Sequence, residues 1–279
     1  MRRRRVRWSK VWTVAKIDLV RLFKSKDYWV PMALLAGIFF VAMPYLLLAV
    51  VTRAEASPLI GQIGGVLETL PGTIRENIRG DTDAARAAYS LAVYLLAPIA
   101  IVVPLTISSA VGASTIVGER ERGTGEFLAH SPLSDKEIYL GKLISSLAPG
   151  YLATAVGFAL YSVIVNLQAG PALGGWFFPT VGWWVLIFWV MPPFLATALS
   201  VILWVSARVK STAAAQQAAS LVSLPIILAS YVVSSGLLVN PALAGATVGV
   251  LAWIVAIIGL TSGSRAVKRE KLLGVGGEG

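Results

Sequence analysis

The residues with the most evident chemistry in this sequence lie in one short stretch, Gly118–Lys142, which reads GERERGTGEFLAHSPLSDKEIYLGK. Its charges alternate in sign at Glu119, Arg120, Glu121 and Arg122. Such side chains can pair with a complementary protein surface and fix the register of the contact. The stretch is therefore interpreted either as a docking element for a soluble partner or as a rigid loop.

The sequence lacks the residues that metal binding or nucleotide hydrolysis would need. There is no cysteine and only one histidine, His130, which we expect to face solvent or a docking partner. An H-E-x-x-H metal site is therefore impossible. The Gly141–Lys142 pair follows Lys136 and precedes Leu143, so it does not form a Walker A phosphate loop. We predict that the chain is not an enzyme and that it binds no metal and no cofactor of its own.

The composition indicates the environment that positions this stretch. The chain has 279 residues, of which 56% are hydrophobic and 14% charged, and its mean hydropathy is +0.75. Soluble domains carry about 25% charged residues. No charged residue or histidine occurs between Leu143 and Ala207 or between Ser211 and Ser264. Runs of this kind indicate a protein that is embedded in a bilayer.

Six apolar segments are each long enough to cross a membrane as a helix. A helix rises about 1.5 Å per residue, so 20 residues span about 30 Å, and a helix satisfies its own backbone hydrogen bonds in lipid. The segments are residues 29–52, 90–117, 143–167, 181–207, 213–239 and 243–262. We therefore predict an all-α polytopic membrane protein. Its six-helix domain covers residues 29–262, and a cytoplasmic tail covers residues 263–279.

The distribution of basic residues predicts the orientation. With the amino terminus in the cytoplasm, 20 of the 24 Lys and Arg lie on the cytoplasmic side and four lie outside. The positive-inside rule then places the protein in the cell membrane with both termini in the cytoplasm. Ten of the basic residues precede residue 29, although the net charge of +10 could also suggest nucleic acid. Because these residues are interleaved with Trp and Leu, they fit a membrane surface instead.

Residues 1–28 are predicted to form a basic tail and an amphipathic helix in the cytoplasmic interface. Apolar residues including Trp8, Trp12, Leu19 and Leu22 recur at helical spacing, and lysines occupy the other face. The helix is either an anchor for the first span or an elbow that also contacts a cytoplasmic partner.

The segment 118–142 is predicted to contain a short helix, a break and a second helix start. Ser134 and Glu137 fit a capping box, so a helix begins there and continues into the third span. Pro132 prevents a continuous helix from the preceding piece. We expect the short helix to cover roughly Glu119–Ala129.

This segment resembles the permease subunits of type-two ABC exporters. The matching residues are Glu119, Glu121, Arg122, Gly123, Thr124, Glu126, Pro132, Ser134, Gly141 and Lys142. The surrounding plan of an interfacial helix and six spans also matches. Gly125 departs from the pattern, because an apolar residue is usual there.

The resemblance implies a transmembrane subunit that pairs with a second permease copy, identical or related, to form the translocation pathway of an exporter. Separate ABC ATPase subunits would bind ATP and Mg, and segment 118–142 would be the coupling helix. The docking residues implied are Glu119, Arg120, Glu121, Arg122, Gly123, Thr124, Glu126, Phe127, Pro132, Ser134 and Glu137.

Two other functions remain open at this point. An ion-coupled carrier usually keeps an ionisable residue within the membrane, and the six predicted spans contain none. A scaffold or signalling subunit without transport is not excluded by any motif. Gly245 and Gly249 form a G-x-x-x-G in the last span, which permits either a dimer contact or close packing within one subunit.

Overall fold

In a computed structural model of the chain, the structure describes residues 6–53, 58–69, 72–239 and 241–266, and within these ranges the regular elements are all helical. The elements, with η marking π- and 3₁₀-helices, are α1 (Trp8–Lys24), α2 (Lys26–Gly37), η1 (Ile38–Ala42), α3 (Met43–Arg53), α4 (Pro58–Glu68), α5 (Gly72–Arg75), α6 (Asp83–Ser90), η2 (Leu91–Leu95), α7 (Ile99–Glu121), α8 (Gly125–His130), α9 (Asp135–Ala169), η3 (Gly170–Leu173), α10 (Val181–Val185), η4 (Leu186–Val190), α11 (Met191–Ser206), α12 (Thr212–Val239) and α13 (Pro241–Ala266).

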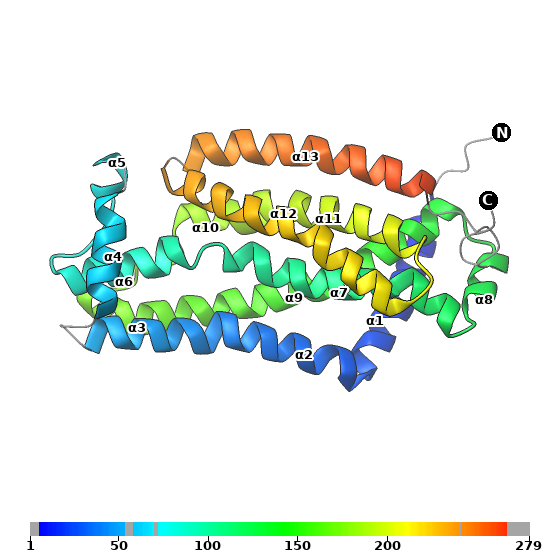
Figure 1. The fold of residues 1–279 in the computed structure, drawn as a ribbon, viewed down its shortest axis with the longest axis horizontal. Helices are drawn as coiled ribbons and strands as arrows, with labels where there is room; N and C mark the ends of the chain where they lie inside the picture. Colours follow the sequence, from blue (N-terminus) through cyan, green and yellow to red (C-terminus); the bar gives the residue numbers. More distant parts are fainter. Residues whose placement is uncertain (1–5, 54–57, 70–71, 240, 267–279) are drawn as a thin grey trace.

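Six of the described helical stretches are long and apolar enough to cross a membrane, which confirms the predicted number of spans. They are Lys26–Arg53, Asp83–Glu121, Asp135–Leu173, Val181–Ser206, Thr212–Val232 and Gly245–Gly263. They run side by side along the long axis of the molecule (Figure 1). The second span is mostly buried among the others, whereas the last two expose most of their surface.

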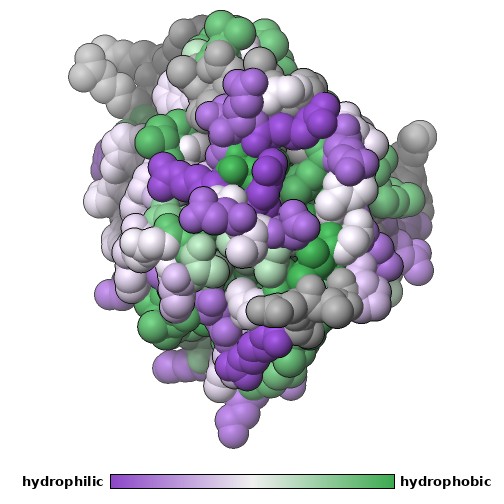
Figure 2. All heavy atoms as spheres, turned by 90° about the vertical axis from the view of Figure 1, so that its left-hand side faces the viewer, coloured by the Kyte–Doolittle hydropathy of each residue, from purple (hydrophilic) through white to green (hydrophobic). Residues whose placement is uncertain are grey.

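The two ends of this bundle carry different short elements (Figure 1). One end, which we call the α1 end, holds α1 and α8. The other, which we call the α6 end, holds α4, α5 and α6. Figure 2 looks onto the α6 end and shows hydrophilic side chains gathered over the middle of that face.

Three of the spans contain a π-helical turn, and a proline follows each of these turns within three residues. Pro44 follows η1, Pro98 follows η2 and Pro192 follows η4. A proline lacks the backbone N–H and clashes with the carbonyl four residues earlier. That carbonyl belongs to the π turn in all three cases. The helix continues directly after η1 and η4, whereas residues 96–98 form a turn between η2 and α7.

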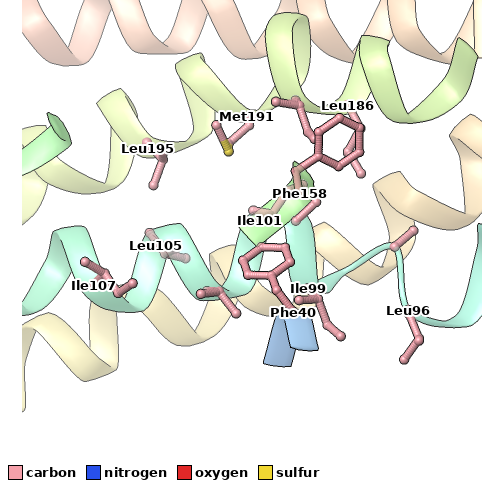
Figure 3. Close-up of a cluster of buried hydrophobic side chains, with 14 of the residues drawn as sticks. Phe40, Leu96, Ile99, Ile101, Leu105, Ile107, Phe158, Leu186, Met191 and Leu195 are labelled. Carbon is pink, nitrogen blue, oxygen red and sulfur yellow. The ribbon is translucent and has the colours of Figure 1, made fainter. Parts of the chain in front are cut away.

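The core lies where the first four spans meet. Figure 3 shows Phe40, Ile101, Phe158 and Met191 converging from four different spans. Gly157 permits the close approach of Phe40, because a Cβ atom there would lie 2.3 Å from Cδ2 of that ring.

The α6 end is fastened by an amide and by aromatic rings. Asn166 Oδ1 accepts hydrogen bonds from the backbone N–H groups of Phe177 and Phe178 at 2.8 and 3.0 Å, and its Nδ2 donates to the carbonyls of Ser162 and Phe178. Trp183 donates from Nε1 to the Val93 carbonyl at 3.0 Å. These bonds hold the turn before α10 against α9 and η2.

A second set of contacts at this end comes from stacked rings. Tyr161 donates from its hydroxyl to the Ala92 carbonyl at 2.6 Å, and its ring stacks on that of Trp183 with 5.1 Å between the centroids. Phe158 and Phe178 pack against the same tryptophan. The polar atoms of both large side chains are therefore satisfied by the carbonyls of η2.

Helix α1 has two apolar stripes where the sequence analysis expected one. Val11, Ala15 and Leu22 are buried against the protein, whereas Trp8 and Trp12 are 67% and 58% exposed. Leu19 is half-buried and lies on the same side of the helix as the two tryptophans. The stripe of Val11, Ala15 and Leu22 therefore packs on the bundle, and the stripe of the two tryptophans is exposed on the surface of the protein.

Candidate functional site

The site begins where α7 ends, at a glycine in the left-handed conformation. Gly123 has φ +68°. The N–H of Thr124 donates to the Glu119 carbonyl at 2.9 Å, and that of Gly123 donates to the Arg120 carbonyl at 3.0 Å. This pair of bonds is a Schellman motif, which terminates a helix.

The position of this motif corrects the predicted helix. The charged residues from Glu119 to Glu121 belong to the second span, and the short helix α8 covers only Gly125–His130. The expected helix over Glu119–Ala129 is therefore two pieces, separated by the turn at Gly123. Glu119 therefore lies within the long helix of the second span, and Lys142 lies in the helix that was predicted to begin at Ser134.

Glu119 is a buried carboxylate at the centre of a group of charged side chains. Its Oε1 accepts from Lys142 Nζ at 3.0 Å and from Arg21 Nη1 at 3.0 Å, and Arg122 Nη2 lies 3.5 Å away. Its Oε2 accepts from the Thr124 hydroxyl. Only 7% of the Glu119 side chain is exposed.

Lys142 extends this group to helix α1. Its Nζ lies 2.9 Å from Oδ2 of Asp18, and only 3% of its side chain is exposed. Ser145 donates a further hydrogen bond to Asp18. We call Asp18, Arg21, Glu119, Arg122, Thr124 and Lys142 the Glu119 cluster. It joins α1, the end of α7 and the start of α9 by charge-assisted contacts.

The next two charges of α7 cap other helices. Arg120 Nη2 donates to the carbonyls of Ser206 and Val209, at and just beyond the carboxyl end of α11. Glu121 accepts from the N–H of Thr212 at 2.7 Å and from its hydroxyl, at the amino end of α12. A cation at a helix carboxyl end and an anion at an amino end both complement the free backbone groups there.

The four alternating charges therefore bind within the chain. Successive side chains of a helix point about 100° apart, so these residues reach four neighbouring helices. Glu119 binds α1 and α9, Arg120 binds α11, and Glu121 binds α12. Arg122 pairs with Glu119 itself. The sequence analysis expected these charges to meet a soluble partner. In the structure their main contacts are to the other helices of the bundle.

Helix α8 is the part of the segment that stands free. Gly125 is buried and Leu128 packs partly on the core, but Phe127 is 80% exposed. This is the largest exposed fraction among the large apolar side chains that the structure describes. Glu126 and His130 are exposed beside it. A short helix thus presents one aromatic ring to the outside of the bundle.

The start of α9 contains the predicted capping box. The Ser134 hydroxyl accepts from the Glu137 N–H at 3.3 Å, and Glu137 Oε2 accepts from the Ser134 N–H at 2.8 Å, which confirms the prediction. Glu137 Oε1 also accepts from the N–H of Arg7 at 2.9 Å, and Lys10 donates to the Pro132 carbonyl. Glu137 and Pro132, which were both expected to dock a partner, therefore bind residues at the beginning of α1.

Asp18 and Arg21 were not singled out from the sequence, and Gly141 was named there without a structural role. A Cβ atom at Gly141 would lie 2.6 Å from Cβ of Val14, so the glycine lets α1 cross α9 closely. Asp18 is the only acid before Asp27 in a segment with ten basic residues. That isolated acid is the signal that could have indicated a specific buried partner.

The G-x-x-x-G of the last span is used inside the chain. Trp189 donates from Nε1 to the Gly245 carbonyl at 3.0 Å. A Cβ atom at Gly249 would lie 1.9 Å from the same nitrogen. Of the two uses considered for Gly245 and Gly249, the structure favours close packing within one subunit.

Comparison with known proteins gives the context of this site. The model of the ABC-2 family transporter protein matches residues 73–275, which is well over half of the chain. The chain belongs to this family. It is a multi-pass membrane protein and the permease component of an ABC transporter. No curated protein matches the sequence.

The matched range divides the Glu119 cluster. Glu119 and Lys142 lie within residues 73–275, whereas Asp18 and Arg21 of α1 lie before them. The ABC-2 match also decides among the functions considered above, because it supports an ABC transporter over an ion-coupled carrier. Even the buried charges do not favour a carrier, because they sit at one end of the spans and are paired with one another.

Proposed function

We propose that this chain is the permease of an ABC exporter and that separate ATPase subunits dock on helix α8. The observation that carries the proposal is Phe127, an aromatic side chain that is 80% exposed on a short helix between two spans. Exposed aromatic rings of this kind are the usual anchors of protein interfaces. Docking of the ATPase would therefore be centred on α8 and only flanked by the charges of α7.

The Glu119 cluster would transmit movement of α8 to the bundle. A force on α8 reaches α7 through the turn at Gly123 and α9 through the cap at Ser134. Because Glu119 and Lys142 also bind α1, the first three spans would move with the docking helix. The contacts of Arg120 and Glu121 extend the same link to α11 and α12.

The rest of the assembly follows from this proposal. The α1 end faces the cytoplasm, where the ATPases are, and the exposed stripe of Trp8 and Trp12 lies in the membrane interface. A second permease copy, identical or related, completes the pathway. The chain itself contributes no ATP chemistry, and ATP and Mg bind to the partner subunits.

The test is copurification of the cognate ATPase subunit with Phe127 variants of the permease. Phe127→Ala should weaken binding roughly tenfold or more, because burial of a large apolar side chain contributes about 1.5–3 kcal/mol. Permease-stimulated ATP hydrolysis should fall in parallel. Phe127→Leu keeps an apolar side chain and should retain most of the binding.

The matched control is Trp176→Ala, which removes an aromatic side chain that is 68% exposed at the opposite end of the bundle. This variant should copurify with the ATPase normally. Undiminished binding by Phe127→Ala would refute docking on α8. The native mass of the wild-type complex gives the number of permease copies, and a single copy with no related partner would refute the paired pathway.

A further inference from the structure

A lateral groove lies between the first and third spans. It has a volume of about 480 Å³ and its lining is almost entirely apolar. The walls come mainly from α2 and α9, and they include the small residues Ala33, Ala36 and Gly37 on one side and Ala153 and Gly157 on the other. We call it the α2–α9 groove.

The groove follows from the shape of the two helices that form it. Fully buried Phe40 rests on Gly157 and brings the spans together at that depth. Toward the α1 end, small side chains such as Ala33, Ala36 and Ala153 leave space between the helices. The rim consists of larger side chains that remain about half exposed, such as Leu152 and Val156. In a membrane this concave strip faces lipid.

The end of the groove near α1 adjoins a corner of the chain that carries basic residues. Phe23 and Trp29 line this end, on either side of the corner between α1 and α2. The corner itself carries Lys24 and Lys26, both exposed. The exposed Lys16 and Arg21 lie farther back on α1, and Asp27 is the one exposed acid beside them. The other acid of α1, Asp18, is already paired with Lys142.

We propose that the α2–α9 groove binds an acyl chain of an anionic phospholipid, whose phosphate group lies at Lys24 and Lys26. The apolar groove suits an acyl chain, and the basic corner supplies the complementary charge for an anionic headgroup. A second copy of this chain is a poorer occupant, because it would bring a second basic corner close to the first. The inference depends on the chain spanning a membrane and not on the ATPase partner.

Selectivity among lipids should come from the headgroup, because the acyl chain is in an apolar environment both before and after it binds. The groove positions the acyl chain, but it cannot distinguish two lipids whose acyl chains are the same. The lysines attract only a negatively charged headgroup. The site should therefore prefer phosphatidylglycerol to phosphatidylcholine with the same acyl chains.

Native mass spectrometry of the full-length protein in detergent can test this preference. Dioleoyl-phosphatidylglycerol or dioleoyl-phosphatidylcholine is added in increasing amounts, and the bound lipids are counted. The wild type should retain one phosphatidylglycerol at concentrations where phosphatidylcholine does not stay bound. Lys24→Gln with Lys26→Gln should weaken that binding about tenfold or more and leave phosphatidylcholine unaffected.

A second variant tests the groove itself. Gly37 lines it, and a Cβ atom there meets nothing within 4 Å, so Gly37→Phe should fill the groove without disturbing the fold. The tightly bound phosphatidylglycerol should then be lost. The control is Leu46→Phe, at a side chain that is 61% exposed on α3, which should bind like the wild type. Unchanged thermal unfolding shows that each variant is folded.

Three results would overturn the proposal. The first is equal retention of phosphatidylglycerol by the wild type and Gly37→Phe. The second is equal affinity for both lipids, which would leave no role for the basic corner. The third is loss of a dimer mass in Gly37→Phe, which would show that a second copy occupies the groove.

Discussion

The two ends of the bundle are held together by different chemistry. At the α6 end, Asn166 and Trp183 satisfy backbone groups through short, direct hydrogen bonds among packed aromatic rings. At the α1 end, Glu119 and Lys142 join helices through long charged side chains. A ring packed in one geometry resists displacement, whereas an ion pair can exchange partners as helices shift. The comparison suggests a fixed α6 end and an α1 end that can rearrange without losing its contacts.

The sharpest test of this comparison is Lys142→Met. Lys142 neutralises both Asp18 and Glu119, and its removal leaves Asp18 in the bundle without its ion-pair partner. Breaking a buried pair in this way costs about 3–5 kcal/mol. We expect a large fall in the thermal unfolding midpoint in detergent. Lys16→Met, at an exposed position of α1, the helix that carries Asp18, should change it little. A stable Lys142→Met variant would mean that the cluster contributes nothing to the fold.

A smaller loss is expected for Asn166→Ala at the other end. The change removes four hydrogen bonds and leaves the N–H groups of Phe177 and Phe178 without their acceptor. The cost should be about 2–3 kcal/mol. The same unfolding measurement checks it, with Ser220→Ala as a control that removes only an exposed hydroxyl. If Asn166→Ala were more damaging than Lys142→Met, the amide and not the ion cluster would be the main tie in the bundle.

The smallest effect is expected at the turn that separates α7 from α8. Gly123→Ala places a Cβ atom on a residue with φ +68°, which costs about 1 kcal/mol. The free energy of unfolding should fall by that amount. Gly123→Asn should cost less, because asparagine tolerates this conformation better. An equal or larger loss with asparagine would mean that space and not backbone conformation requires the glycine.

The spans could be predicted from the sequence because membrane thickness imposes a minimum length on each apolar run. The Ser134 cap was also predictable, because its residues are three positions apart in the chain. The ends of the spans could not be predicted in this way. A prediction from apolar length ends the second span before its first charged residue, Glu119. The helix continues past this point because neighbouring side chains neutralise the Glu119 carboxylate.

The pairing within the Glu119 cluster could not be predicted for a related reason. Glu119 meets Arg21 across 98 positions of the chain, and Lys142 meets Asp18 across 124. Which charges meet depends on how α1, α7 and α9 are rotated about their axes, and a single sequence does not specify those rotations. The prediction of a charged docking surface followed from treating Glu119–Ala129 as a separate short helix between two spans, whereas Glu119 belongs to α7.

The tetrapeptide 119–122 also limits how this protein can change in evolution. The side chains of Glu119, Arg120 and Glu121 are aimed at different segments by the rotation of one continuous helix, and Arg122 pairs with Glu119. Deletion or insertion of one residue in the last turns of α7 would rotate all of them by about 100° at once. Arg21, Lys142 and the ends of α11 and α12 would then all lose the side chain that binds them in this structure. Point substitutions can be compensated one contact at a time, but a change in length here cannot, so we expect homologous permeases to vary in length on the far side of Gly123 and not before it.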